Sequence, residues 1–369
     1  MFVRIKHIID RIKNENLKQS ALQAIPFFVA SARVGVVAVV YARLFSFAEH
    51  LSMQLFEGNY WVFLAVSPVC FVVAWFLVKR FAPNAQGSGI PQVMASIELA
   101  NPKTYKIISK FLSMKVILIK VLSSIVIVFG GGAIGREGPT IQIAGSIFKK
   151  VNELLPDWWP KVSRRNMITA GAAAGLAAAF NTPLGGIVFS LEELSKSHIN
   201  FFKTPVFAAV IIAGLTAQGL AGTYLYLGFP SIDQVSFMSY VGILAVGTLS
   251  GLLGSLLSKF ILAIMEWKQK LTSNWQQVGY VVLCALCMVG LAIGVSSSVM
   301  GSGRELMTGL LFTDNKYNEW YIPILRFAGP LFSFTTGAAT GIFAPALSAG
   351  ASVGSLVSDW LGFSASDTN

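Results

Sequence analysis

The chain has 369 residues, of which 54% are hydrophobic and 12% are charged, and its formal net charge is +11. A soluble protein carries about 25% charged residues, so this composition excludes an ordinary soluble domain and predicts a chain embedded in a bilayer. Three uncharged runs agree with a membrane protein, because each is longer than the roughly 20 apolar residues that span a bilayer. They cover 25 residues in 167–191, 25 in 234–258 and 33 in 271–303.

The first twenty residues are polar and periodic, and no cleavable signal peptide is predicted from them. The stretch "IKHIIDRIK" instead indicates a short amphipathic helix on the membrane surface, within a segment 1–22. Basic residues are frequent here and recur between two later apolar segments. They are Arg4, Lys6, Arg11, Lys13 and Lys18, then Lys149, Lys150, Lys161, Arg164 and Arg165. This pattern places the N-terminus and the 149–165 connection in the cytoplasm by the positive-inside rule, and nucleic acid is not an expected partner.

Apolar segments follow one another along the rest of the chain. They fall near 25–47, 59–79, 111–129, 132–148, 167–191, 204–230, 236–264, 278–300, 321–338 and 341–362. The stretch "FNTPLGG" interrupts 167–191, while 132–148 and 341–362 begin with loops rich in glycine and proline. Helices that break at membrane depth are tolerated where they are buried in protein or line a cavity, which favours a transporter or channel core.

Two motifs recur in the same order. "GGAIGREGP" from Gly131 matches "GAATGIFAP" from Gly337 at an offset of 206 residues, and "GSGIP" from Gly87 has a counterpart in "GSGRE" from Gly301. We therefore expect two transmembrane repeats, 23–231 and 232–369, the second of them incomplete.

Three of these motifs are typical of the start of a short helix. "GSGIP", "GREGP" and "GIFAP" each combine glycine, which allows close backbone approach, with proline, which fits the first helical turn. The N–H groups at a helix N-terminus have no helical partner and attract anions. Helix packing through small residues is the alternative for any one motif. Nucleotide binding is not predicted, because no GxxG follows "GSG".

Together the motifs resemble the CLC family of chloride channels and chloride/proton exchangers. "GSGIPQV" (87–93), "GREGPTIQIAG" (135–145), "AGAAAGLAAAFNTPLGGIVFSLEE" (170–193) and "GIFAPAL" (341–347) stand in that family's order, and the resemblance extends from about residue 25 to the end. It implies an all-α polytopic membrane protein with inverted repeats and broken, tilted helices.

The resemblance also implies the roles of residues. Ser88 would offer its hydroxyl to a central anion and favour chloride, and the amides of Ile342 and Phe343 would face the same ion. Glu137 would be the gating glutamate, and the amides of Gly135, Arg136 and Glu137 would line an outer site. Arg136 is expected to orient its loop. Support for these loops is expected from Gly87, Gly89, Pro91, Gly138, Pro139, Gly341 and Pro345.

A second acid separates an exchanger from a channel. In "FSLEEL", Glu193 matches the internal proton-transfer position of the family's exchangers, and Glu192 is expected to be structural. The alternative is that both acids lie at a membrane–water boundary. His198 could act as a proton relay, but a solvated loop position is favoured for it.

The resemblance therefore implies a secondary transporter that exchanges chloride for protons, as a homodimer, and we expect it in the bacterial inner membrane. The alternatives are a chloride channel and, less favoured, a non-transporting truncated protein. Neither an enzyme, a cofactor nor a metal site is predicted: Cys284 and Cys287 form a CxxC without a second pair, and the histidines lack ligand spacing. The family's C-terminal helices, with the tyrosine that shares the central anion, are not recognised after residue 362.

Overall fold

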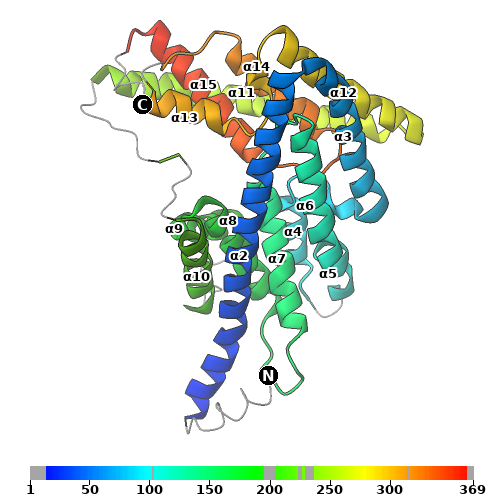
Figure 1. The fold of residues 1–369 in the computed structure, drawn as a ribbon. Helices are drawn as coiled ribbons and strands as arrows, with labels where there is room; N and C mark the ends of the chain where they lie inside the picture. Colours follow the sequence, from blue (N-terminus) through cyan, green and yellow to red (C-terminus); the bar gives the residue numbers. More distant parts are fainter. Residues whose placement is uncertain are drawn as a thin grey trace. The chain divides into compact units, whose positions relative to one another are not determined.

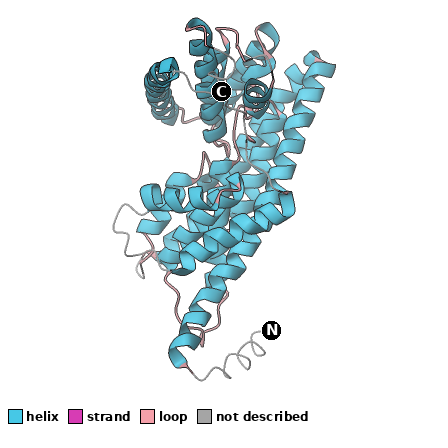
Figure 2. Ribbon diagram, turned by 90° about the vertical axis from the view of Figure 1, so that its left-hand side faces the viewer, coloured by secondary structure: helices cyan, strands magenta, loops and turns pink. Residues whose placement is uncertain are grey.

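The computed structural model describes residues 14–101, 104–194, 204–222, 227–228, 237–313 and 316–363. These residues form helices joined by loops, and no strand occurs among them (Figure 2). The predicted all-α class is therefore confirmed. The predicted amphipathic helix over 1–22 lies largely outside the described residues, and a long helix α2 (Glu15–Gly58) begins within its range.

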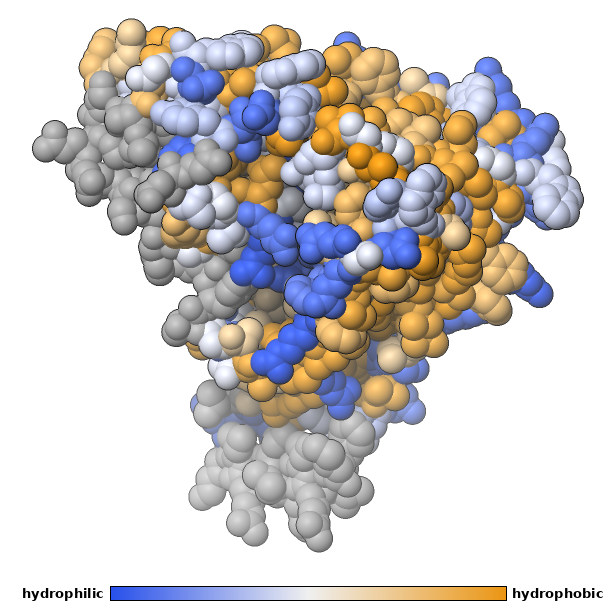
Figure 3. Space-filling model, turned by 45° about the horizontal axis from the view of Figure 1, so that its top comes forward, coloured by the Kyte–Doolittle hydropathy of each residue, from blue (hydrophilic) through white to orange (hydrophobic). Residues whose placement is uncertain are grey.

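Within the described residues, five helical spans are long and apolar enough to cross a membrane, and one of them joins α5 (Tyr105–Phe111) and α6 (Met114–Phe129). These spans are Lys18–Gly58, Tyr60–Phe81, Tyr105–Phe129, Phe237–Gln269 and Asn274–Gly294. Hydrophobic side chains are exposed over much of the face drawn in Figure 3. An exposed apolar surface of this extent fits a chain that lipid or another protein covers.

The chain folds as two compact units, each with its own core. Unit 1 comprises Met1–Val40, Ile90–Ile117 and Thr140–Tyr224, and unit 2 comprises Tyr41–Gly89, Leu118–Pro139 and Leu225–Asn369. The predicted repeat boundaries at 22/23 and 231/232 remain predictions.

Unit 1 is built around an alanine- and glycine-rich helix, α8. Its helices are α4 (Ile90–Glu98), α5 (Tyr105–Phe111), α8 (Arg164–Phe180), α9 (Pro183–Phe189) and α10 (Thr204–Ala221), with the first part of α2 and most of α7 (Glu137–Glu153). α8 packs against α10, α9 and α4 (Figure 1). A β-carbon on Gly175 would lie 2.6 Å from that of Ala144 on α7, so the small residue lets α7 and α8 approach closely.

The predicted interruption of 167–191 is confirmed. Asn181 adopts a left-handed conformation with φ 55° and ends α8, and Pro183 begins α9. Asparagine tolerates this conformation better than most residues, and proline's missing N–H has no helical partner at a first turn.

Unit 2 contains the longer helices of the C-terminal half. These are α3 (Tyr60–Phe81), most of α6 (Met114–Phe129), α11 (Phe237–Gln269), α12 (Asn274–Gly294), α13 (Arg304–Phe312), α14 (Ile322–Phe334) and α15 (Phe343–Trp360), with the second part of α2. α3 packs along α12, and α15 contacts α11, α13 and α14 (Figure 1). The loops before α7, α13 and α15 lie within this unit and carry the candidate site.

Candidate functional site

Two of the predicted motifs are joined through the segment that precedes α15. The N–H of Gly87 donates to the carbonyl of Ala338 at 2.9 Å, and the N–H of Thr340 donates to the carbonyl of Gly87 at 3.1 Å. The N–H of Gly135 donates to the carbonyl of Gly341 at 2.7 Å. Segments that lie up to 253 residues apart in sequence therefore meet through their backbones.

Glycine is needed where these backbones pass each other. A β-carbon on Gly341 would lie 2.5 Å from the carbonyl oxygen of Gly135, and one on Gly135 would lie 3.1 Å from the β-carbon of Ala344. Real β-carbons essentially never lie within 3.0 Å of another heavy atom, so an alanine at position 341 would push the two loops apart.

Ser88 lies beside the start of α7. A β-carbon on Gly138 would come within 2.9 Å of the β-carbon of Ser88, which is half-buried between two glycines with positive φ, Gly87 and Gly89. The structure therefore brings Ser88 to the motif that contains Glu137, within unit 2. Pro91 follows in the first turn of α4 and belongs to unit 1.

Glu137 is the first residue of α7, and its side chain is only 2% exposed. Its carboxylate lies against the backbone N–H groups of Glu137 itself and of Ala344, in the first turn of α15. Its Oε2 atom has no hydrogen-bond partner. The partial positive charge and the unpaired N–H groups of a helix N-terminus favour a carboxylate there, whereas its burial opposes the charge. The amides of Ile342 and Phe343 are at this same terminus.

Arg136, next to Glu137, points to α2. Its Nη1 atom donates to the carbonyl of Ala42 at 2.9 Å and to the hydroxyl of Ser46 at 3.2 Å. These contacts attach the "GREGP" loop to α2. They agree with the interpretation that Arg136 orients the loop.

Sequence reasoning missed two polar residues of α6 that hold the loops. Lys120, fully buried, donates from Nζ to the carbonyls of Ala85 and Gly87 at 3.0 and 2.8 Å. The hydroxyl of Ser123 accepts the N–H of Ala339 at 3.1 Å. A signal was present in the sequence, since Lys120 is the one charged residue in 116–135 and charges within membrane segments are rare and usually functional.

A second loop in unit 2 is held in a similar way by Arg326, which was also missed. Arg326 is fully buried on α14, and its guanidinium donates to the carbonyls of Ser298 and Met300 at 2.9 Å and to the hydroxyl of Ser348 at 2.8 Å. This fixes the loop that carries "GSGRE" immediately before α13. The N–H of Ser302 in that loop donates to Glu49 of α2.

Glu193 is not part of this cluster. It lies in unit 1 in a π-helical turn, Ser190–Leu194, and its side chain is exposed, as is that of Glu192. His198 lies outside the described residues. Cys70, Cys284 and Cys287 are free thiols, and no group of three histidine, cysteine or acidic residues fits a metal ion within the described part of the chain.

Comparison with known proteins places this arrangement in a family. Residues 70–367 match the sequence model of the voltage gated chloride channel family. Over 298 residues the chain is 30% identical to a protein of Cronobacter sakazakii named H(+)/Cl(-) exchange transporter ClcA. That match covers 77% of this chain and 60% of the relative, so the chain spans less than two thirds of the relative's length.

Solved structures share the fold. A slow cyanobacterial Cl-/H+ antiporter is 23% identical with a TM-score of 0.75, covering 92% of this chain and 80% of its own. A CLC-type fluoride/proton antiporter is 18% identical, also with a TM-score of 0.75, covering 95% and 84%. A eukaryotic CLC transporter is 22% identical with a TM-score of 0.73, covering 92% and 61%. At these sequence identities the structural similarity is evidence for the fold alone, and it confirms the predicted architecture.

Proposed function

Because the chain belongs to the voltage-gated chloride channel family, also called CLC, we propose that it exchanges chloride for protons across a membrane. The observation that carries this proposal is the Glu137 carboxylate, which is buried against the N-terminus of α15. A permeating anion would use the same N–H groups, so Glu137 is a tethered competitor for the anion. The relatives named for their activity are transporters, one of them a bacterial chloride/proton exchanger.

The mechanism follows from that competition. Ionised Glu137 occupies the anion site, whereas protonation removes its charge and its hold on the N–H groups. The carboxyl group can then leave the site and a chloride ion can enter it. Because only partial charges hold the chloride, the ion can also depart again. Binding of chloride and binding of a proton are thereby linked at one residue. Ser88 and the amides of Gly135, Arg136, Ile342 and Phe343 would hold the chloride, and Gly87, Gly89, Pro91, Gly138, Pro139, Gly341 and Pro345 would shape their loops.

Glu193 would deliver protons from the cytoplasmic side. Its exposed position in the π-helical turn that follows α9 suits exchange of protons with water. Glu192 beside it would have a structural role. A chloride channel, the alternative function, needs no such acid.

We further propose a homodimer in a bacterial inner membrane, with the N-terminus in the cytoplasm. Only 11% of the most apolar stretch of α11 is buried within the chain, against 33–50% for the other four candidate spans. A second copy could cover α11. The basic residues near the N-terminus and the bacterial relative support the orientation and the location.

The test uses purified protein in liposomes with a chloride gradient, with chloride efflux and internal pH recorded together. A potassium ionophore sets the voltage, and fluoride replaces chloride in a parallel series. Proton movement against its own gradient, driven by chloride, is the expected result. Chloride flux without proton movement would support the channel instead, and an absence of flux would contradict both transport functions.

A further inference from the structure

A cavity of about 340 Å³ lies within unit 2, next to the "GSGRE" loop. Its lining includes two carboxylates, Glu49 of α2 and Glu305 of α13, together with the buried Arg326. Ser52 and Asn318 also line it, and the hydroxyl of Ser52 and the side-chain Nδ2 of Asn318 are buried atoms without a hydrogen-bond partner. Buried polar atoms of this kind are usually satisfied by water, so the cavity is suited to hold water.

A much smaller cavity, of about 10 Å³, lies beside the gate. Its polar lining consists of Ser46, Glu49, Arg136, Glu137, Ser302 and Arg304. This volume corresponds to about one water molecule, and the site offers more than the two to four polar partners that a buried water needs. Glu137 is one of these lining residues, and its Oε2 atom has no hydrogen-bond partner.

Glu49 lines both cavities. Its Oε1 accepts the N–H of Ser302 at 2.5 Å, and the carboxylate interacts electrostatically with that of Glu137. Glu49 can come this close to the loop only because residue 301 is glycine. A β-carbon there would lie 2.6 Å from Glu49 Oε1, and the backbone of Gly301 has a φ of +65°. The fold therefore holds an ionisable side chain between a space for water and the gating carboxylate.

We propose that Glu49 is a proton relay between the larger cavity and Glu137. A proton passes from water in the cavity to the Glu49 carboxylate and then, through the water of the small cavity, to the Glu137 carboxylate. Glu49 returns to its ionised form, so protons balance and no other reactant is needed. Reversal of the steps releases a proton. The inference rests on the proposed function, because it assumes that Glu137 takes up and releases protons during transport.

The charged groups around Glu49 are compatible with this role. Arg136, Arg304 and Glu137 are the charged side chains that line the small cavity with it. Glu305, Tyr317 and Arg326 are the titratable or charged side chains on the side of the larger cavity. A carboxylate between cations and another carboxylate can accept and return a proton.

The experiment compares Glu49→Gln, Glu49→Asp and Glu305→Gln in liposomes. Glutamine at 49 keeps an oxygen for the N–H of Ser302 but cannot carry a proton, and Glu305→Gln removes the same charge from the same cavity without facing Glu137. We expect Glu49→Gln to slow coupled proton and chloride transport about tenfold, the low range for loss of an acid–base group. The rate of coupled transport by Glu49→Gln should also no longer depend on the pH on one side of the liposome membrane. Glu49→Asp and Glu305→Gln should stay close to wild type.

The Glu137→Gln variant serves as a second background, in which a relay role of Glu49 can be distinguished from a structural role. In Glu137→Gln, chloride flux no longer needs a proton, so adding Glu49→Gln should leave that flux unchanged. A loss of chloride flux in the double variant would make Glu49 structural and overturn the proposal. Wild-type rates and pH dependence in Glu49→Gln, or an equal loss in Glu305→Gln, would also overturn it.

The outcomes for the relay and for the proposed function are distinct. If the wild type exchanges ions and Glu137→Gln is uncoupled, the proposed function stands, and the Glu49 variants decide the relay alone. If the wild type moves no protons, the proposed function fails and the relay fails with it.

Discussion

At the scale of single residues, the proposed mechanism joins anion binding to proton binding at Glu137. Its carboxylate is buried and lies against the N–H groups that begin α15. Glu137→Gln removes the titratable group while keeping the side-chain shape. We expect proton transport to fall by at least about 100-fold while chloride still moves, because the neutral side chain no longer needs a proton to leave the site. Paired chloride and pH recordings in liposomes check this, and coupled transport that survives in the variant would refute the gate assignment.

Glu193 allows a separate prediction at the same scale. Glu193→Gln should stop proton uptake and leave chloride flux, because the groups proposed to bind chloride lie in unit 2 and do not include this side chain. Its neighbour Glu192 is equally exposed and supplies the matched control, Glu192→Gln, for which both fluxes should persist. Unchanged proton uptake in Glu193→Gln would return this residue to a role at the membrane–water boundary.

At the scale of elements, the contact between the loops before α7 and α15 is limited by space at Gly341. Gly341→Ala would place a β-carbon 2.5 Å from the carbonyl oxygen of Gly135. We expect destabilisation by about 1–3 kcal/mol, the usual cost of overpacking, together with slower chloride flux. The control is Gly350→Ala within α15, where a β-carbon meets no atom within 4 Å. Thermal unfolding in detergent compares the two, and equal stability would contradict the close approach.

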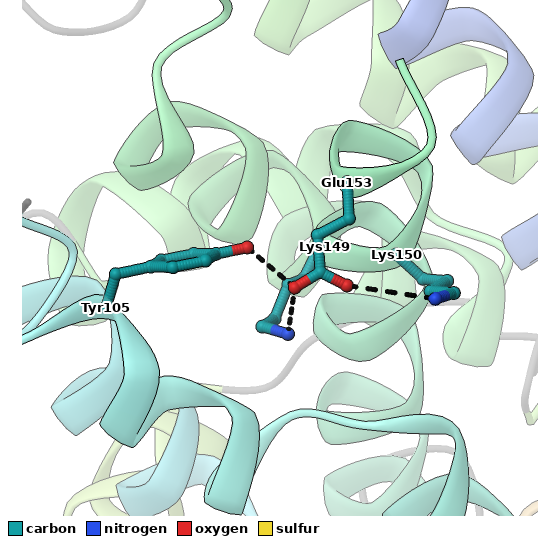
Figure 4. A network of polar contacts seen from close by, with 4 residues as sticks. All are labelled: Tyr105, Lys149, Lys150 and Glu153. Atoms are coloured by element: carbon teal, nitrogen blue, oxygen red, sulfur yellow. Dashed lines mark hydrogen bonds and ion pairs between the residues drawn. The ribbon is translucent and has the colours of Figure 1, made fainter. Parts of the chain in front are cut away.

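A second element-scale feature is a polar network at the C-terminal end of α7 in unit 1 (Figure 4). Glu153 Oε1 accepts from the Tyr105 hydroxyl at 2.7 Å and from Lys149 Nζ at 2.6 Å, and Lys150 lies 4.0 Å from Oε2. Partial burial alone would raise the pKa of Glu153, but the hydrogen bonds from Lys149 and Tyr105 outweigh it, and the pKa is lowered.

This lowered pKa predicts how stability depends on pH. The stabilisation from ionised Glu153 is fully present above its unfolded pKa of about 4.3, and it is lost as the pH falls through the lower folded value. Glu153→Gln should therefore be less stable than wild type by about 1 kcal/mol near neutral pH, since solvent screens this partly exposed group. The difference should shrink as the pH falls from neutral to about 3. Thermal unfolding in detergent at both pH values measures it, and a difference that does not shrink in acid would contradict the assignment.

At the scale of the whole molecule, the apolar surface of α11 predicts self-association. Leu244, Leu252 and Leu262 are 61–72% exposed, and the chain itself covers little of the helix. We expect light scattering with detergent correction to give the mass of two chains. Replacing the three leucines by alanine should shift the particles toward one chain, and a single-chain mass for the wild type at every concentration would contradict the dimer.

Much of the architecture could be predicted from the amino-acid sequence, because its signals are local. The length of an apolar run determines whether a helix can cross a bilayer, and glycine and proline restrict where a helix begins or ends. The break between α8 and α9 and the helix starts at Glu137 and Phe343 were accordingly predicted. The four family motifs assigned roles to Ser88, Glu137 and Glu193 by resemblance, and these roles stay predictions.

Only the tertiary structure decided which distant groups meet. Lys120 donates to the carbonyl of Gly87, Arg326 fixes the loop before α13, and Glu49 contacts Ser302 across 253 positions of sequence. Buried polar groups take whichever partners the packed helices bring within hydrogen-bond distance, and no local pattern encodes those partners. For that reason the motifs singled out Glu137 as the proposed gate, whereas the fold was needed to reveal the two cavities that Glu49 lines.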